Sequence, residues 1–119
     1  GDYTISGNTT QYGDQFIHSA EGLVLTTGTY TLETVPVTSG KSIQFDYVVY
    51  NDSEDSRAGT VIVVWNSTTA TLTDNSTPDI NGVTDTVKFD VTNDGTNVRL
   101  NVVTGVDGWS VVGGTRVIF

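Results

Sequence analysis

Residues 41–50, KSIQFDYVVY, decide the fold class. One face of this stretch carries Ile43, Phe45, Tyr47 and Val49, and the other carries Gln44, Asp46, Val48 and Tyr50. Alternation with a period of two is typical of a β-strand that buries one side. Residues 41–50 therefore predict one strand of a sheet, which needs neighbouring strands from the flanking sequence.

The sequence that follows supplies further strands, separated by turn signals. The polar turn NDSEDS at 51–56 precedes an apolar run at 59–65, which predicts a central strand covered on both faces. Shorter strands are expected at 69–73, 87–91, 98–102, 109–112 and 115–119. They are separated by the loop 74–82, the turn Asn93-Asp94-Gly95 and the pair Gly113-Gly114. On the strand at 98–102 we expect Val98, Leu100 and Val102 inside, and Arg99 and Asn101 outside.

Residues 1–40 are less clearly patterned. They suggest short strands at 3–6, 15–18, 23–26 and 30–37, split by glycines. Throughout the chain threonine and valine dominate, and both favour pleated surfaces. The sequence predicts one all-β domain over 1–119, an antiparallel β-sandwich of jelly-roll-like type with about nine to eleven short strands.

Composition excludes several chemistries. The 119 residues include no Cys and no Met, so disulfides, thiolate metal sites and cysteine nucleophiles are impossible. The single histidine, His18, lacks a nucleophile motif around it and is expected to be a surface or interface residue of a strand. With 5 basic and 14 acidic residues the net charge is -9, which disfavours nucleic acid as a partner.

Neither membrane insertion nor a signal peptide is indicated. The longest apolar run, at 61–65, is far shorter than the roughly 20 residues that a spanning helix needs. Because the chain opens at Gly1 without Met, it is either processed or part of a longer protein, and we expect the second.

Acidic residues in two loops suggest a possible calcium site. Asp52, Glu54 and Asp55 share one turn, while Asp74 and Asp79 flank the loop 74–82. Ca²⁺ prefers such oxygen ligands, but the spacing typical of a calcium-binding loop is absent. Our expectation is therefore no cofactor, with Ca²⁺ as the alternative. The three glutamates lie in unrelated segments, so a paired-carboxylate glycosidase is a minority hypothesis and we expect no enzyme.

Five residues near the turns are candidates for binding: Tyr50, Asp52, Asp55, Arg57 and Trp109. Exposed aromatic rings on a β-sandwich could stack on sugars, although most strand aromatics belong to a core. We expect Arg57 to form a surface ion pair with Asp52, Glu54 or Asp55, and Gly59 to mark a bulge or a close approach of two backbones.

A family resemblance covers residues 41–119. Its motifs are 45–51 (FDYVVYN), 57–61 (RAGTV) running into Val64-Trp65, the loop 74–79, 98–100 (VRL), 108–111 (GWSV) and Arg116-Val117. These residues resemble a β-rich module at the C-terminal end of virion structural proteins of tailed bacteriophages, notably fibre and appendage proteins. The resemblance implies a non-enzymatic component of the virion surface, usually displayed as a trimer.

Two valines expected to be exposed, Val48 and Val112, also favour self-assembly. Left uncovered they would make strand edges prone to aggregation, and a closed symmetric assembly would bury them. We expect a homotrimer in a fibre, knob or capsid decoration. Its other partners would be virion proteins and a host surface glycan or protein, met through the loops 51–57, 74–82 and 107–108. The alternative is a secreted bacterial carbohydrate-binding or adhesin domain, for which Ca²⁺ would be the stabilising ion.

Overall fold

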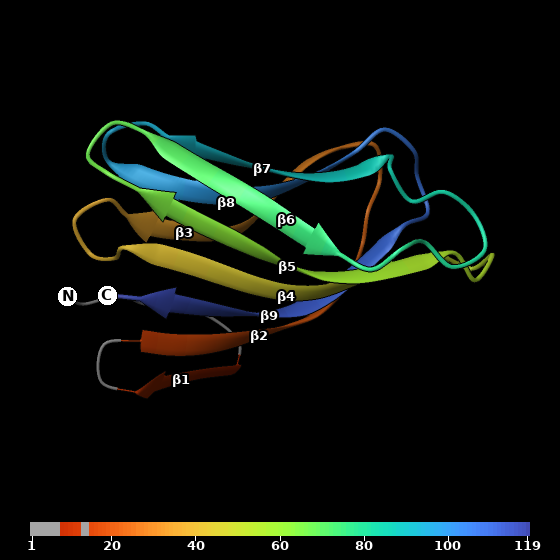
Figure 1. Ribbon diagram of the computed structural model, residues 1–119, viewed down its shortest axis with the longest axis horizontal. Helices are drawn as coiled ribbons and strands as arrows, with labels where there is room; N and C mark the ends of the chain where they lie inside the picture. The colour runs from red at the N-terminus through yellow and green to blue at the C-terminus, as the bar shows by residue number, and fades with distance from the viewer. Residues whose placement is uncertain (1–7, 13–14) are drawn as a thin grey trace.

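The computed structural model describes residues 8–12 and 15–119, and residues 8–24 by their backbone alone. All regular structure in these ranges is β (Figure 1). The strands are β1 (Asn8–Tyr12), β2 (Gln15–Val24), β3 (Gly28–Pro36), β4 (Ser42–Tyr50), β5 (Ser56–Trp65), β6 (Ala70–Ser76), β7 (Val87–Asn93), β8 (Asn97–Thr104) and β9 (Ser110–Ile118). The described part of the chain has no helix that is long and apolar enough to cross a membrane.

Two antiparallel sheets pack against each other. The larger sheet has the strand order β1-β2-β9-β4-β5-β6, and the smaller has the order β3-β8-β7. The all-β class and the packing of two antiparallel sheets are thereby confirmed. The jelly-roll path and the strand total for the whole chain stay predictions.

The core lies between the sheets and follows the alternation in the sequence. Every inward residue expected on β4 is buried, as are Val98, Leu100 and Val102 on β8. Aromatic rings join the two layers, because Phe89 of the smaller sheet packs 4.5 Å from Tyr47 and 5.9 Å from Phe45, measured between ring centroids. The expectation for Asn101 was wrong. Its side chain is buried and bonded to Asp90 and Thr31.

Strand boundaries differ from the sequence prediction where glycine or polar residues indicate a break. Gly113-Gly114 does not separate two strands, since β9 runs unbroken through both. A Cβ on Gly113 would lie 2.8 Å from the Phe45 ring, so glycine here makes room for a core aromatic. Likewise β6 continues to Ser76, β2 joins the two short strands expected at 15–18 and 23–26, and the strand expected at 3–6 lies outside the described residues.

The sandwich has two distinct ends (Figure 1). The loops 25–27, 51–55, 77–86 and 105–109 gather at one end, on the right of the view, and we call them the loop end. The last residues of β9 lie at the other end, where the backbone N–H of Lys41 donates to the Ile118 carbonyl at 2.7 Å. The loops proposed above for binding thus share one end of the molecule.

Candidate functional site: the loop end and the outer sheet face

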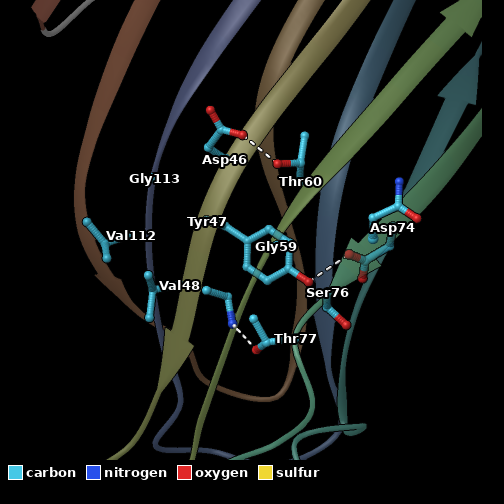
Figure 2. Close-up of a pocket in the computed structure, with 12 residues that line it drawn as sticks. Asp46, Tyr47, Val48, Gly59, Thr60, Asp74, Ser76, Thr77, Val112 and Gly113 are labelled. Atoms are coloured by element: carbon cyan, nitrogen blue, oxygen red, sulfur yellow. Dashed lines mark hydrogen bonds between the residues drawn. The ribbon is translucent and has the colours of Figure 1, made fainter.

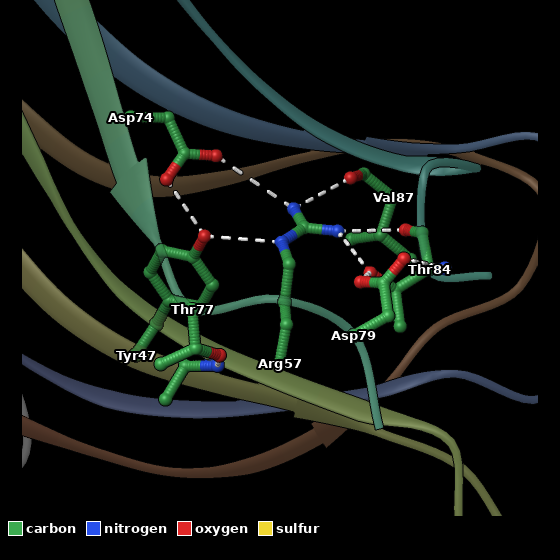
Figure 3. Close-up of polar contacts among 8 residues, drawn as sticks. Tyr47, Arg57, Asp74, Thr77, Asp79, Thr84 and Val87 are labelled. Atoms are coloured by element: carbon green, nitrogen blue, oxygen red, sulfur yellow. Dashed lines mark hydrogen bonds and ion pairs between the residues drawn. The ribbon is translucent and has the colours of Figure 1, made fainter. Parts of the chain in front are cut away.

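A buried arginine holds the loop end to the sandwich. Arg57 on β5 is only 8% exposed, and its guanidinium donates in three directions (Figure 3). Nε donates to the Tyr47 hydroxyl at 3.1 Å, Nη1 to the Thr84 carbonyl at 2.7 Å, and Nη2 to the Val87 carbonyl at 2.7 Å. Because Thr84 and Val87 belong to the 77–86 loop and to β7, this one side chain connects the two sheets.

Two hydroxyl groups extend this network to carboxylates. Tyr47 accepts from Arg57 and donates to Asp74 Oδ1 at 2.7 Å. Thr84 Oγ1 accepts from Arg57 at 3.0 Å and donates to Asp79. Burial raises the pKa of the Tyr47 phenol, so its hydroxyl keeps the proton that it donates. Arg57 also pairs with Asp74 at 3.7 Å, which corrects our expectation of a surface pair with Asp52, Glu54 or Asp55.

Asp55 fastens the 51–55 turn to the 77–86 loop. Its carboxylate accepts from the Gly82 backbone at 2.7 Å, from Asn81 Nδ2 at 2.8 Å and from Asn51 Nδ2 at 3.0 Å. These donors favour the charged form, and the Asn51 bond is the largest cause of a lowered Asp55 pKa. Asn81 has a left-handed backbone, with φ of 69°, and its side chain also donates to the Ser53 carbonyl. The two acidic loops are therefore a single hydrogen-bonded unit.

A second carboxylate fixes the remaining two loops to each other. Asp107 accepts from the Thr27 backbone at 2.6 Å and from the Thr27 hydroxyl at 2.9 Å. The backbone bond is the largest cause of a lowered Asp107 pKa. Leu25 and Trp109 also pair through Leu25 N–H and the Trp109 carbonyl at 2.7 Å. All four loops of the loop end are thus tied to a neighbour or to the sandwich.

Between these loops lies a small open hollow. Its lining includes Asp52, Val83, Val106 and Asp107. Val83 is 66% exposed and Val106 is 49% exposed, so the hollow offers apolar contact beside carboxylates. This is the surface that the loop end presents to solvent.

The second surface is the outer side of the larger sheet. A broad, shallow groove crosses it, lined in part by Asp46, Val48, Thr60 and Val112 (Figure 2). The Thr60 hydroxyl donates to Asp46 at 2.6 Å. Gly59 also lines the groove. A Cβ there would clash with the backbone carbonyl of Asn75 and lie 3.0 Å from Ser76 Cα, which confirms the close backbone approach expected at this glycine.

The candidate binding residues fall in three environments. Tyr50 lies exposed on the outer side of β4, and Asp52 lies exposed in the 51–55 turn. Arg57 and Asp55 are taken up by the bonds described above. Trp109, at 6% exposure, belongs to the core, so its ring presents no free face on which a sugar could stack.

The candidate calcium ligands are divided by the same bonds. Asp74 accepts from the Tyr47 hydroxyl, and Asp79 accepts from the Thr84 hydroxyl, so both are engaged through partners of Arg57. Asp55 accepts from the Gly82 backbone, while Glu54 lies exposed. Among the residues that the structure describes, no group of three or more His, Asp or Glu side chains is placed to hold a metal ion. Calcium binding stays a prediction. His18 lies in β2, and its side chain falls outside the described part.

Sequence reasoning missed Thr84, Asn81 and the role of Tyr47. Thr84 and Asn81 lie more than 25 residues from their partners Arg57 and Asp55, so no local spacing could reveal the pairs. One signal was available: an arginine among the inward positions of an apolar strand needs buried acceptors. No family model, curated protein or solved structure matches this chain.

Proposed function

We propose that this chain is a non-enzymatic structural module of a bacteriophage virion, exposed as a fibre, knob or capsid decoration component. In this proposal copies of the chain assemble as a homotrimer on the particle surface with other virion proteins. The loop end faces outward and is available for a host glycan or protein. The jelly-roll-like path expected from the sequence belongs to the same proposal.

One observation carries the proposal. Three charged groups of the loop end that could serve catalysis or metal binding, Arg57, Asp55 and Asp79, instead hold loops in place. Each of these groups is hydrogen-bonded within the chain, and satisfied networks of this kind make a structure rigid. A fixed set of loops on a β scaffold suits display and attachment.

Particle composition tests the proposal directly. Purified particles of the phage that encodes the chain should yield its peptides by mass spectrometry, in a constant ratio to the main capsid protein. Antibodies raised against the loop end should decorate intact particles at one type of location in electron micrographs. Peptides that appear only in the infected-cell lysate and never in purified particles would refute a virion role.

A second candidate function, a carbohydrate-binding domain, is favoured by Tyr50. Tyr50 is 40% exposed on the outer side of β4, two residues beyond Val48, which lines the groove. Under this alternative a glycan array gives hits that Tyr50→Ala abolishes and Asp52→Asn retains. Stabilisation by Ca²⁺ would appear as a higher melting temperature with Ca²⁺ than with a chelator.

A further inference from the structure

We propose that the outer face of the larger sheet is buried against other copies of this chain. We define the outer face by the outward residues Asp46, Val48, Tyr50, Thr60, Ile62, Val64, Val112 and Arg116. The inference rests on the self-association included in the proposed function, and it names the surface that is used.

The apolar character of this face is the first reason. Val48, Tyr50 and Ile62 are each 40% exposed and Val64 is 53% exposed, all on the adjacent strands β4 and β5. A half-buried antiparallel strand normally turns polar residues outward. The sequence of β5 predicts a strand covered on both faces, yet in the described part of the chain its outward residues Ile62 and Val64 remain exposed. A neighbouring protein would supply the missing cover.

Charge is the second reason, and it selects another copy of the chain as the partner. Among the outward positions of β4, β5, β6 and β9, only Asp46 and Arg116 are charged. The face is therefore electrically balanced, although the whole chain carries -9. Two copies meeting through any of the acidic loops would repel each other, whereas two outer faces would not.

The positions of the two charges allow them to pair between copies. Arg116 is in register with Gln44, and Asp46 is in register with Gly114. The two charged residues therefore lie on adjacent strands, and they are offset from each other by two residues along the strand direction. A copy that turns its β9 side toward the β4 side of its neighbour brings Arg116 of one to Asp46 of the other. This contact repeats around a symmetry axis.

The size of the face is sufficient for such a contact. Four strands at about 4.8 Å spacing, each about 30 Å long, give a surface of the same order as the roughly 800 Å² per partner of a standard interface. Stacked sheets pack closely when their facing side chains are small and β-branched, as the valines and Ile62 are.

Light scattering on the purified chain, with and without one substitution, is the first test. The native chain should show an oligomer at micromolar concentration, and Ile62→Lys should raise the apparent dissociation constant at least about tenfold. Val83→Lys makes the same chemical change at an exposed valine of the loop end and should leave the oligomer intact. Circular dichroism checks that both variants remain folded.

Charge reversal is the second test and identifies the partner as another copy. Asp46→Arg and Arg116→Asp should each weaken assembly, because each places like charges opposite each other. A mixture of the two variants should assemble more strongly than either alone. Equal assembly of the mixture and the separate variants would overturn the pairing.

The outcomes separate this inference from the proposed function. A native chain that remains monomeric at high concentration, or an oligomer that Ile62→Lys leaves unchanged, overturns the inference about the outer face. A dimer disrupted by Ile62→Lys supports the face and contradicts the trimer. Absence of the chain from purified particles refutes the virion role and leaves the result on the face standing.

Discussion

Arg57 shows how much one residue depends on geometry as well as charge. Its guanidinium satisfies acceptors in three directions, which a lysine ammonium at one point cannot do. We expect Arg57→Lys to lower the free energy of unfolding by about 2 kcal/mol, because buried acceptors lose their donors. Urea denaturation measures the change.

Arg99 provides the matched control for Arg57. It pairs with Asp94 at 2.8 Å, but its side chain is 38% exposed. Arg99→Lys should cost less than about 0.5 kcal/mol, as is usual for surface pairs. Equal losses in the two variants would contradict the structural role that we assign to Arg57.

The carboxyl group of Asp55 makes the stability of the fold depend on pH. Its pKa is lowered below the ordinary value of 3.8 in the folded state, mainly by the bond from Asn51 and then by the bond from Gly82. A lowered folded pKa stabilises the protein at pH values above the unfolded pKa. That stability is lost as the pH falls through the folded value.

The melting temperature should therefore fall as the pH drops below about 4, and Asp55→Asn should make this fall shallower. Asp52→Asn removes an exposed carboxylate from the same turn and should retain the profile of the native chain. A profile that Asp55→Asn leaves unaltered would mean that other carboxylates govern the acid response.

At the scale of elements, glycines determine how closely strands approach. A Cβ on Gly59 would lie 2.9 Å from the Tyr47 hydroxyl and closer still to the Asn75 carbonyl. Gly59→Ala should destabilise the fold by about 1–3 kcal/mol through overpacking. Gly105→Ala is the control, since a Cβ there meets nothing within 4 Å. Thermal unfolding of the two variants should differ clearly.

The strands also show which features of the fold can be predicted from the sequence. Alternation identified the buried sides of β4 and β8, and Asn93-Asp94-Gly95 correctly marked the turn between β7 and β8. These signals are local, because each depends on neighbouring residues. The partners of Arg57 and the continuity of β9 depend on distant residues, namely Thr84, Val87 and Phe45. The candidate site was therefore located by its loops, while its bonds were not.

At the scale of the whole molecule, β9 holds the larger sheet together. It pairs with β2 on one side and β4 on the other, and Val117 is fully buried. A chain of residues 1–109 should show no cooperative thermal transition, because β2 and β4 would each lose their pairing with β9, and the core would lose Val111 and Val117. Calorimetry of this shortened chain is the measurement.

Arg116→Ala tests whether the effect belongs to β9 as a strand. It changes an exposed position of β9 and preserves the pairing, so this variant should unfold cooperatively near the native temperature. A cooperative transition in the shortened chain would show that the remaining strands form a domain without β9.

The central place of β9 has a consequence during synthesis. Strands β4 to β6 emerge from the ribosome well before β9, which must enter between β2 and β4. Folding of the larger sheet therefore waits until residues 110–118 are free of the ribosome. We expect a product of interrupted translation that lacks these residues to leave the edges of β2 and β4 unpaired and to be cleaved readily by proteases.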